Sequence, residues 1–209
     1  MTIRLLVTGF EPFPGAPVNP TAHLIRHFQD NPPASLAPVE SRFAVLPVDY
    51  ARTVPALEEA VAGFEPDVAV HFGLSGRAAG FRLERLARNE IASGVPDNAG
   101  TRPQASVIRE GGDHVASSLP LDRIFSALEA EGHTVEWSDD AGGYLCNYVF
   151  YHSSAGLCRG VRARLSGFVH VGHVALPGVP ADQAVMDFRN FAQGAELILQ
   201  TCLVEARGE

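Results

Sequence analysis

Hydrophobic positions along the chain form short continuous runs that alternate with longer stretches of helical periodicity. Continuous apolar runs of about four to eight residues, closed by glycine or proline, are typical of strands buried on both faces of a mainly parallel sheet. Runs of this kind predict strands over residues 3–7, 68–73 and 167–171, and strands are also expected over residues 42–48 and 134–137.

Residues 81–86 follow a different pattern, because apolar and polar side chains alternate there with a period of two. This alternation predicts a strand with one face toward the core and one toward solvent. The two faces would carry Phe81, Leu83 and Arg85 on one side and Arg82, Glu84 and Leu86 on the other.

Apolar residues spaced three or four apart predict helices in the remaining regular segments. These helices are expected over residues 54–62, 121–131, 144–157 and 181–205, and from about Thr21 with Asn19 or Thr21 as the cap and Pro20 near the first turn. Proline and glycine punctuate residues 11–20 and 94–112, which are predicted to be loops.

Strands and helices alternate along the chain without a repeat, linker or low-complexity segment. This order predicts a single domain over residues 1–209 with an α/β fold. We expect a three-layer α/β/α arrangement, in which helices cover both faces of a mixed, mainly parallel open sheet, as in phosphorylases and hydrolases. In such sheets ligands bind beyond the carboxyl ends of the strands.

Composition narrows the class of protein. Hydrophobic residues make up 46% of the chain and charged residues 19%, as in folded globular proteins. The net charge of −8 argues against a nucleic-acid partner or an anionic membrane surface.

All 16 basic residues are arginines, so a Schiff-base lysine or a P-loop lysine is excluded. The three cysteines have neither paired nor CxxC spacing, and no long apolar span occurs, so we expect a cytoplasmic protein without a metal site or disulfides.

Cys146 is the first candidate for chemistry. It follows two glycines in GGYLCNYVFY and enters a predicted helix, where the helix dipole and unpaired backbone N–H groups favour a thiolate. His170 stands near the end of the apolar run SGFVHV, and a cysteine with a histidine base is the minimal set for a thiol hydrolase. A buried cysteine that only fills space is the alternative. The topology favours chemistry, because Phe10, Gly73, Cys146 and His170 all follow strand ends or flank them at one edge of the sheet.

Five segments occur in an order that closely resembles the pyrrolidone-carboxylate peptidase (pyroglutamyl peptidase type I) family. They are VTGFEPFPGAPVNPT, HFGLSGRAAGFRLERLARN, VPDNAG, DDAGGYLCNYVFY and SGFVHV, and the resemblance spans roughly residues 3–170. It implies a cysteine exopeptidase that removes N-terminal pyroglutamate, without a cofactor, and that forms dimers or tetramers.

The resemblance also implies a role for individual residues. Cys146 matches the nucleophile, His170 the base, and Glu84 the carboxylate that orients the imidazole. From the residues alone Glu84 would be read as a solvated strand charge. The match is consistent with the logic of hydrolytic triads, in which a carboxylate fixes the tautomer of the histidine.

The substrate pocket is implied in the same way. Positions that match the family's lactam-binding residues are Phe10, Phe13, Leu74, Val95 and Leu145, although Phe10 and Phe13 could equally be core residues. A pocket for a neutral lactam should be apolar and without a counter-charge for an ammonium group, and Glu11 is the one acidic candidate. The chain departs from the family at Leu74, at Gly94, where many bacterial members carry arginine, and at Gly172 and His173.

Three rival interpretations remain open on the sequence. The first is a binding protein whose triad is present but idle. The second is a metal hydrolase that uses His23 and His27 or His170 and His173, although neither pair has acidic residues at HExxH spacing. The third is a nucleoside phosphorylase-like enzyme, although no convincing glycine-rich phosphate loop precedes a helix.

Overall fold

The computed structural model describes residues 2–37, 39–91, 94–180 and 182–208. Within these residues a central sheet has six strands in the order β2-β1-β3-β8-β4-β7. The strands are β1 (Arg4–Phe10), β2 (Glu40–Leu46), β3 (Val68–Leu74), β4 (Phe81–Glu84), β7 (Val135–Ser138) and β8 (Leu165–Val171). Neighbouring strands are parallel except for β4 and β8, which are antiparallel. The prediction of a mixed, mainly parallel sheet is therefore confirmed.

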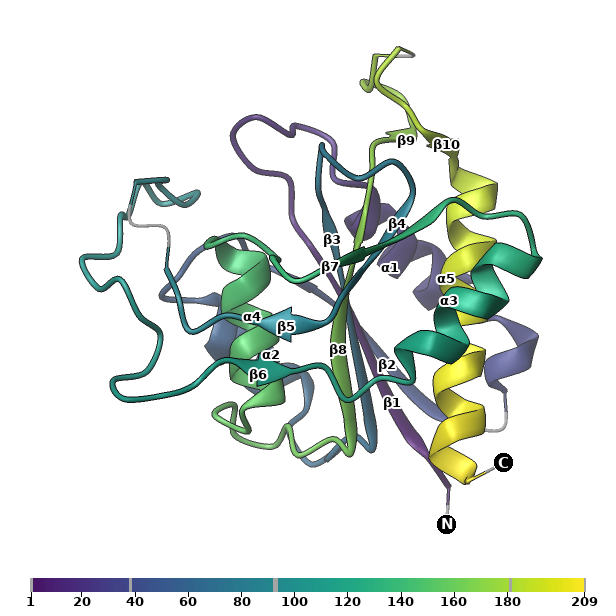
Figure 1. Cartoon of the computed structure of the whole chain (residues 1–209), viewed down its shortest axis with the longest axis horizontal. Coiled ribbons are helices and arrows are strands. Elements are labelled where there is room, and N and C mark those ends of the chain that lie inside the picture. Colours follow the sequence, from purple (N-terminus) through teal and green to yellow (C-terminus); the bar gives the residue numbers. More distant parts are fainter. Residues whose placement is uncertain (1, 38, 92–93, 181, 209) are drawn as a thin grey trace.

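Helices cover both faces of this sheet (Figure 1). One face carries α1 (Pro20–Asp30), α3 (Leu121–Ala130) and α5 (Phe188–Arg207), and the other carries α2 (Thr53–Ala60) and α4 (Leu145–Ser154). Smaller elements are the 3-10 helix η1 (Ala34–Leu36), the antiparallel pair β5 (Leu86–Ala87) and β6 (Val115–Ala116), and the parallel pair β9 (Val174–Ala175) and β10 (Met186–Asp187). None of the described helices is long and apolar enough to cross a membrane.

The alternation of side chains along the strands explains why the strand sequences are continuously apolar. In β3, for example, Val70 packs into the cluster beside α1 and α5, while Ala69 packs into the cluster beside α2 and α4. In β8, Val169 and Phe168 divide between the same two clusters. Because both faces are buried, neither needs polar residues except where a site is built.

Helix ends follow local chemistry. Asn19 caps α1, since its side chain accepts a hydrogen bond from the Thr21 N–H, and Pro20 occupies the first turn as predicted. The predicted helix over 181–205 begins later, at Phe188, because Asp187 accepts the Asn190 N–H and acts as the cap. Residue 181 itself lies outside the described residues. The helix ends at Gly208 in the left-handed conformation.

The prediction of a half-exposed strand over residues 81–86 is wrong. β4 ends at Glu84 and lies inside the sheet between β8 and β7, where Phe81, Leu83 and Glu84 are fully buried. Its polar residues are paired rather than solvated: Arg82 Nε donates to Glu136 Oε1 on β7 at 2.7 Å. The alternating pattern therefore reflects two faces that both lie inside the protein. One face is apolar, and the other carries polar side chains that pair with neighbouring strands.

Residues 94–112 form an ordered loop without helix or strand, as predicted. The buried carboxylate of Asp97 accepts backbone N–H groups of Tyr50, Ala99 and Thr101 at 2.8–3.0 Å. Asn98 Nδ2 donates to the carbonyl of Pro12 at 3.0 Å. The bond to Pro12 attaches the loop to the segment after β1, and the bond to Tyr50 attaches it to the segment after β2, both at the carboxyl edge of the sheet.

Candidate active site

A cavity of about 140 Å³ opens at the carboxyl ends of β1, β3 and β8, beside the first turn of α4. Of the residues singled out in the sequence, it brings together Phe10, Phe13, Leu74, Leu145, Cys146 and His170. The remaining described residues that line it are Asn19, Val48, Ser75, Arg77, Asp140, Ala141, Gly142 and Tyr144. The convergence that the topology predicted for Phe10, Cys146 and His170 is therefore present in the structure.

Cys146 is the second residue of α4, and its side chain is half-buried. Because Cys146 is in the first turn of α4, the N–H groups of that turn and the positive end of the helix dipole lie close to the thiol. No side chain caps the helix at Tyr144, so no capping side chain pairs with these N–H groups. On the sheet side the thiol packs against Gly73, where an added Cβ would lie 2.9 Å from Cys146 Sγ and 2.7 Å from Phe168 Cζ. A glycine at the end of β3 therefore provides the space that the thiol occupies.

Glu84 and His170 form a buried pair, with His170 Nδ1 and Glu84 Oε1 at 2.8 Å. Their strands are antiparallel, and the register sets Glu84 opposite Phe168 and Arg82 opposite His170. Glu84 and His170 are thus diagonal neighbours on one face of the sheet, within reach of each other. Among the described residues Glu84 Oε2 has no hydrogen-bond partner, so the imidazole is the group that balances this carboxylate.

The surroundings of His170 favour its charged form. Burial on its own would lower the pKa of His170, but the charge of Cys146 and hydrogen bonds to Cys146 and Glu84 outweigh burial and raise the pKa to about 9. Since Nδ1 bonds to Glu84, Nε2 is the ring nitrogen left for the thiol. Glu84 on one side of the imidazole and a Cys146 thiolate in the same cavity therefore both favour an imidazolium.

Two aromatic side chains form part of the cavity wall. Phe10 is buried against Phe168, with ring centroids 6.2 Å apart, and Phe13 tilts over Tyr144 at the same distance. A pair of hydrogen bonds between Phe13 and Ala16 closes a tight loop that holds the Phe13 ring in place. Phe10 belongs to the core and also lines the cavity, and Phe13 packs against the same core cluster and lines the cavity; a contact with a lactam stays a prediction for both.

Leu74, Leu145 and Val95 have different positions relative to the cavity. Leu74, at the end of β3, and Leu145, the first residue of α4, are buried and line it. Val95 is 48% exposed and is not among the described residues that line it. A substrate contact by Val95 stays a prediction.

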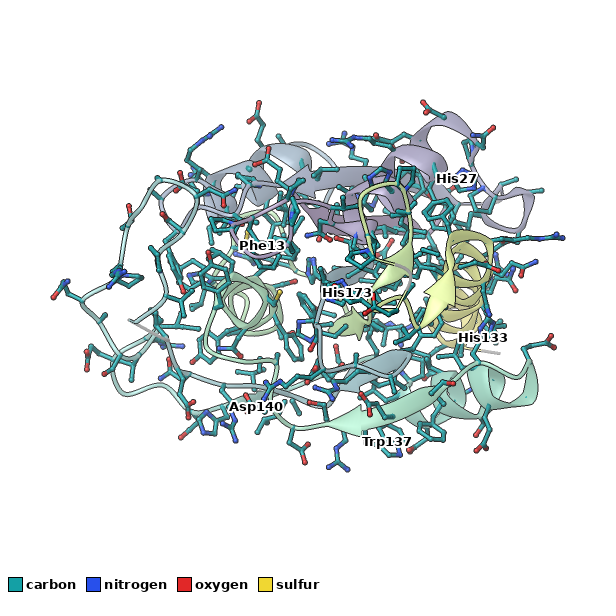
Figure 2. All side chains as sticks on the ribbon, turned by 90° about the horizontal axis from the view of Figure 1, so that it is seen from above. Phe13, His27, His133, Trp137, Asp140 and His173 are labelled. Carbon is teal, nitrogen blue, oxygen red and sulfur yellow. The ribbon has the colours of Figure 1, made fainter. Side chains whose placement is uncertain are left out.

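The acidic residue at the cavity is Asp140 and not Glu11. Glu11 is exposed and does not line the cavity in the described part of the chain, whereas Asp140 does. Asp140 Oδ1 accepts the Gly142 N–H at 3.0 Å and lies 3.7 Å from Arg88 Nη1. Figure 2 shows Phe13 and Asp140 on opposite sides of α4, which is seen there along its axis. Asp140 was not among the residues predicted from the sequence, although it stands in the segment DDAGGYLCNYVFY that contains Cys146.

A hydrogen-bonded network behind the thiol was also missed. His71 on β3 is fully buried, with Nδ1 2.8 Å from Thr8 Oγ1 and Nε2 2.9 Å from Ser153 Oγ. Ser153 Oγ lies 2.8 Å from Ser166 Oγ, so the network joins β1, β3, β8 and α4. Burial lowers the pKa of His71 to about 3, which keeps the ring neutral. An isolated histidine inside the apolar run VAVHFG was the available signal.

The histidine pairs considered as metal ligands do not form such a site. His27 packs edge-on against Phe188 and lies on the α1 side of the molecule, away from α4 (Figure 2). Across the described residues no group of three or more His, Cys, Asp or Glu side chains could hold a metal ion.

Comparisons with known proteins agree on one family. The pyroglutamyl peptidase family model matches residues 3–192. The pyrrolidone-carboxylate peptidase of Pyrococcus furiosus is 35% identical over 173 residues, or 82% of each chain. That of Clavibacter michiganensis is 31% identical over 203 residues, or 97% of this chain and 93% of the relative. A solved structure of pyrrolidone carboxyl peptidase from Pyrococcus furiosus, reported with its cysteine-free mutant, superposes with a TM-score of 0.85 at 28% identity and covers 98% of this chain and all of that one.

Proposed function

Because the chain belongs to the pyroglutamyl peptidase family of cysteine peptidases, we propose that it removes N-terminal pyroglutamate from peptides by means of Cys146, His170 and Glu84. The observation that carries this proposal is the buried Glu84–His170 pair, whose imidazole lines the same aromatic-walled cavity as the Cys146 thiol. Peptide substrates, a dimeric or tetrameric state and a cytoplasmic location remain predictions of the family resemblance and the composition.

In the proposed first step the Cys146 thiolate attacks the carbonyl carbon of the pyroglutamyl residue. The negative charge moves to the carbonyl oxygen, and the backbone N–H of Cys146 at the start of α4 is suited to stabilise it. The His170 imidazolium then gives its proton to the departing amine, so the C–N bond breaks and a thioester to Cys146 remains.

In the second step a water molecule replaces the departed peptide. Neutral His170 accepts a proton from this water as the oxygen attacks the thioester, and the thiolate leaves as pyroglutamate is released. Glu84 holds His170 by Nδ1 throughout and stabilises the imidazolium each time it forms. His170 supplies and accepts the protons that the two steps require, and Cys146 forms and releases the thioester, so neither step needs a cofactor or metal.

The cavity also suits the proposed substrate. A lactam ring is flat and uncharged, so it can leave water against Phe10 and Phe13 at little electrostatic cost. A free amino terminus would bring an ammonium group into the cavity, and burying an unpaired charge costs several kcal/mol. Asp140 is already bonded to Gly142 N–H and approached by Arg88, which reduces its value as a counter-charge.

The test is turnover of a pyroglutamyl fluorogenic amide by single-cysteine variants. Cys146→Ala and Cys146→Ser should be inactive. Cys158→Ser and Cys202→Ser should retain activity, because both thiols are buried and burial raises the pKa of Cys158 to about 12 and that of Cys202 further. Loss of turnover in a folded Cys158→Ser or Cys202→Ser variant would contradict the assignment of the nucleophile. Wild-type Cys146 should also react with iodoacetamide at neutral pH, whereas an idle buried thiol would not.

A further inference from the structure

Arg77 lines the cavity but has no part in the proposed chemistry. It lies on the loop between β3 and β4, its side chain is exposed, and no ion pair joins its guanidinium to a described residue. The backbone of the loop is fixed, because Ala78 N–H donates to Ser75 at 3.0 Å and the Arg77 carbonyl accepts from Arg82 Nη2 at 3.3 Å. An unpaired cation is thus held at the rim of the site.

The loop is hydrogen-bonded to the end of β8, the strand that carries His170. Ser75 N–H donates to the Val171 carbonyl at 2.9 Å, and Gly172 N–H donates to the Gly80 carbonyl at 3.1 Å. The departing amine takes its proton from His170 in the proposed mechanism, so the rest of the peptide must leave past this strand end. Arg77 therefore stands on the side of the departing peptide, whereas the apolar walls hold the lactam.

The charges at the cavity are unequal. Asp140 has its partners in Arg88 and the Gly142 N–H, while Arg77 has no ion-pair partner among the described residues. The pyroglutamyl ring is neutral, so it carries no anion that could pair with the Arg77 guanidinium. Within a bound peptide, the residue that follows pyroglutamate is the first that can bring an anion to this guanidinium. A guanidinium binds carboxylates through two parallel N–H···O bonds.

We propose that Arg77 binds a carboxylate on the residue after pyroglutamate and so makes acidic or very short pyroglutamyl peptides preferred substrates. This inference rests on the proposed function and adds a specificity residue to it. The carboxylate has two sources, the side chain of aspartate or glutamate in a longer peptide and the free terminal carboxylate of a dipeptide. Since Arg77 is exposed, the preference should be modest, about 3- to 10-fold in kcat/KM.

The experiment compares matched neutral and acidic substrates. One pair is pyroglutamyl-aspartic acid α-amide with pyroglutamyl-asparagine α-amide, which tests the side chain. The other is pyroglutamyl-alanine with its amide, which tests the terminal carboxylate. The enzymes are wild type, Arg77→Gln, Arg77→Glu and the control Arg102→Gln, which changes an exposed arginine of the 94–112 loop that does not line the cavity.

We expect wild type and Arg102→Gln to favour the acidic member of at least one pair by about 3- to 10-fold. The ratio should fall to about one in Arg77→Gln and below one in Arg77→Glu, and it should weaken with salt in wild type. An acidic-to-neutral ratio of kcat/KM equal to one in both pairs for wild type, or a preference that survives Arg77→Gln, overturns the inference. The proposed function still stands in that case if the neutral amides are turned over. A folded enzyme that turns over none of the four substrates overturns both.

Discussion

Glu84 and His170 face each other diagonally across the one antiparallel strand pair of the described central sheet, with Oε1 and Nδ1 2.8 Å apart. Glu84 is fully buried on β4, and His170 on β8 is only 5% exposed, where it lines the cavity. The carboxylate therefore has little solvation from water, and its charge acts on the imidazole at short range.

This relationship predicts the effect of Glu84→Gln. The amide has the shape of the carboxylate but no charge, so His170 should lose the group that fixes its tautomer and stabilises its imidazolium. We expect kcat to fall by about 10²- to 10⁴-fold with a small change in KM. Steady-state kinetics on a pyroglutamyl amide measures this, with Glu136→Gln as a control because Glu136 pairs with Arg82 on the neighbouring strand. Nearly full activity in Glu84→Gln would contradict the role of Glu84.

The pH dependence follows from the raised pKa of His170. Burial alone would lower that pKa, but Cys146 and Glu84 raise it from its usual 6.5 to about 9. A raised folded-state pKa means that the charged imidazole contributes stability that is fully present below about pH 6.5 and is lost as the pH rises through about 9. The alkaline limb of kcat/KM should fall in the same range, near pH 9.

Removing the thiol tests the cause of this shift. In Cys146→Ala the charge and hydrogen bond of Cys146 are absent, so burial weighs more and the pKa of His170 should fall below its wild-type value. An NMR titration of the imidazole signals in wild type and variant measures the difference. An unchanged or higher pKa in Cys146→Ala would show that the thiol does not act on His170.

Gly73→Ala tests whether the Cys146 thiol needs the space beside Gly73. A Cβ at this position would lie 2.9 Å from Cys146 Sγ and 2.7 Å from the buried ring of Phe168, so the thiol must move. We expect kcat to fall about 10- to 100-fold, because misplacing a reacting atom by about 1 Å has effects of that size. Gly94→Ala is the control, since a Cβ there meets nothing within 4 Å. Equal kcat values in the two variants would show that catalysis does not depend on the position of the Cys146 thiol beside Gly73.

Phe13→Ala tests the aromatic wall. Loss of this ring removes a contact of a few kcal/mol, so kcat/KM for pyroglutamyl substrates should fall about 10- to 1000-fold. Good activity on a matched prolyl substrate should not appear, because an ammonium group still lacks a free counter-charge. Comparable wild-type rates on pyroglutamyl and prolyl substrates would refute this account of selectivity. The double variant Phe13→Ala/Asp140→Asn would show whether Asp140 contributes.

The sequence predicted most of the scaffold because strand burial and helix periodicity are local properties. Cys146 and His170 could be placed at one edge of the sheet from the order of elements alone. Glu84 could not, since its partner is 86 positions away and the pairing depends on an antiparallel register that no local pattern encodes. The resemblance supplied it. Asp140 and Arg77 were missed for a related reason, because loops are brought to the cavity by long-range hydrogen bonds.

The network around His71 has a mechanical consequence for the thiol. α4 is ten residues long, with Cys146 near its beginning and Ser153 seven residues farther on, so a hydrogen bond at one end of the helix affects the position of the other. Apolar contacts tolerate a helix that slides along a sheet, since they have no preferred direction. The bonds from Ser153 to His71 and Ser166 admit one axial position, and the Asn147 side chain clamps the other end to the backbone of Arg88 and Glu90. The position of the sulfur along the helix axis is therefore set by side chains that do not line the cavity.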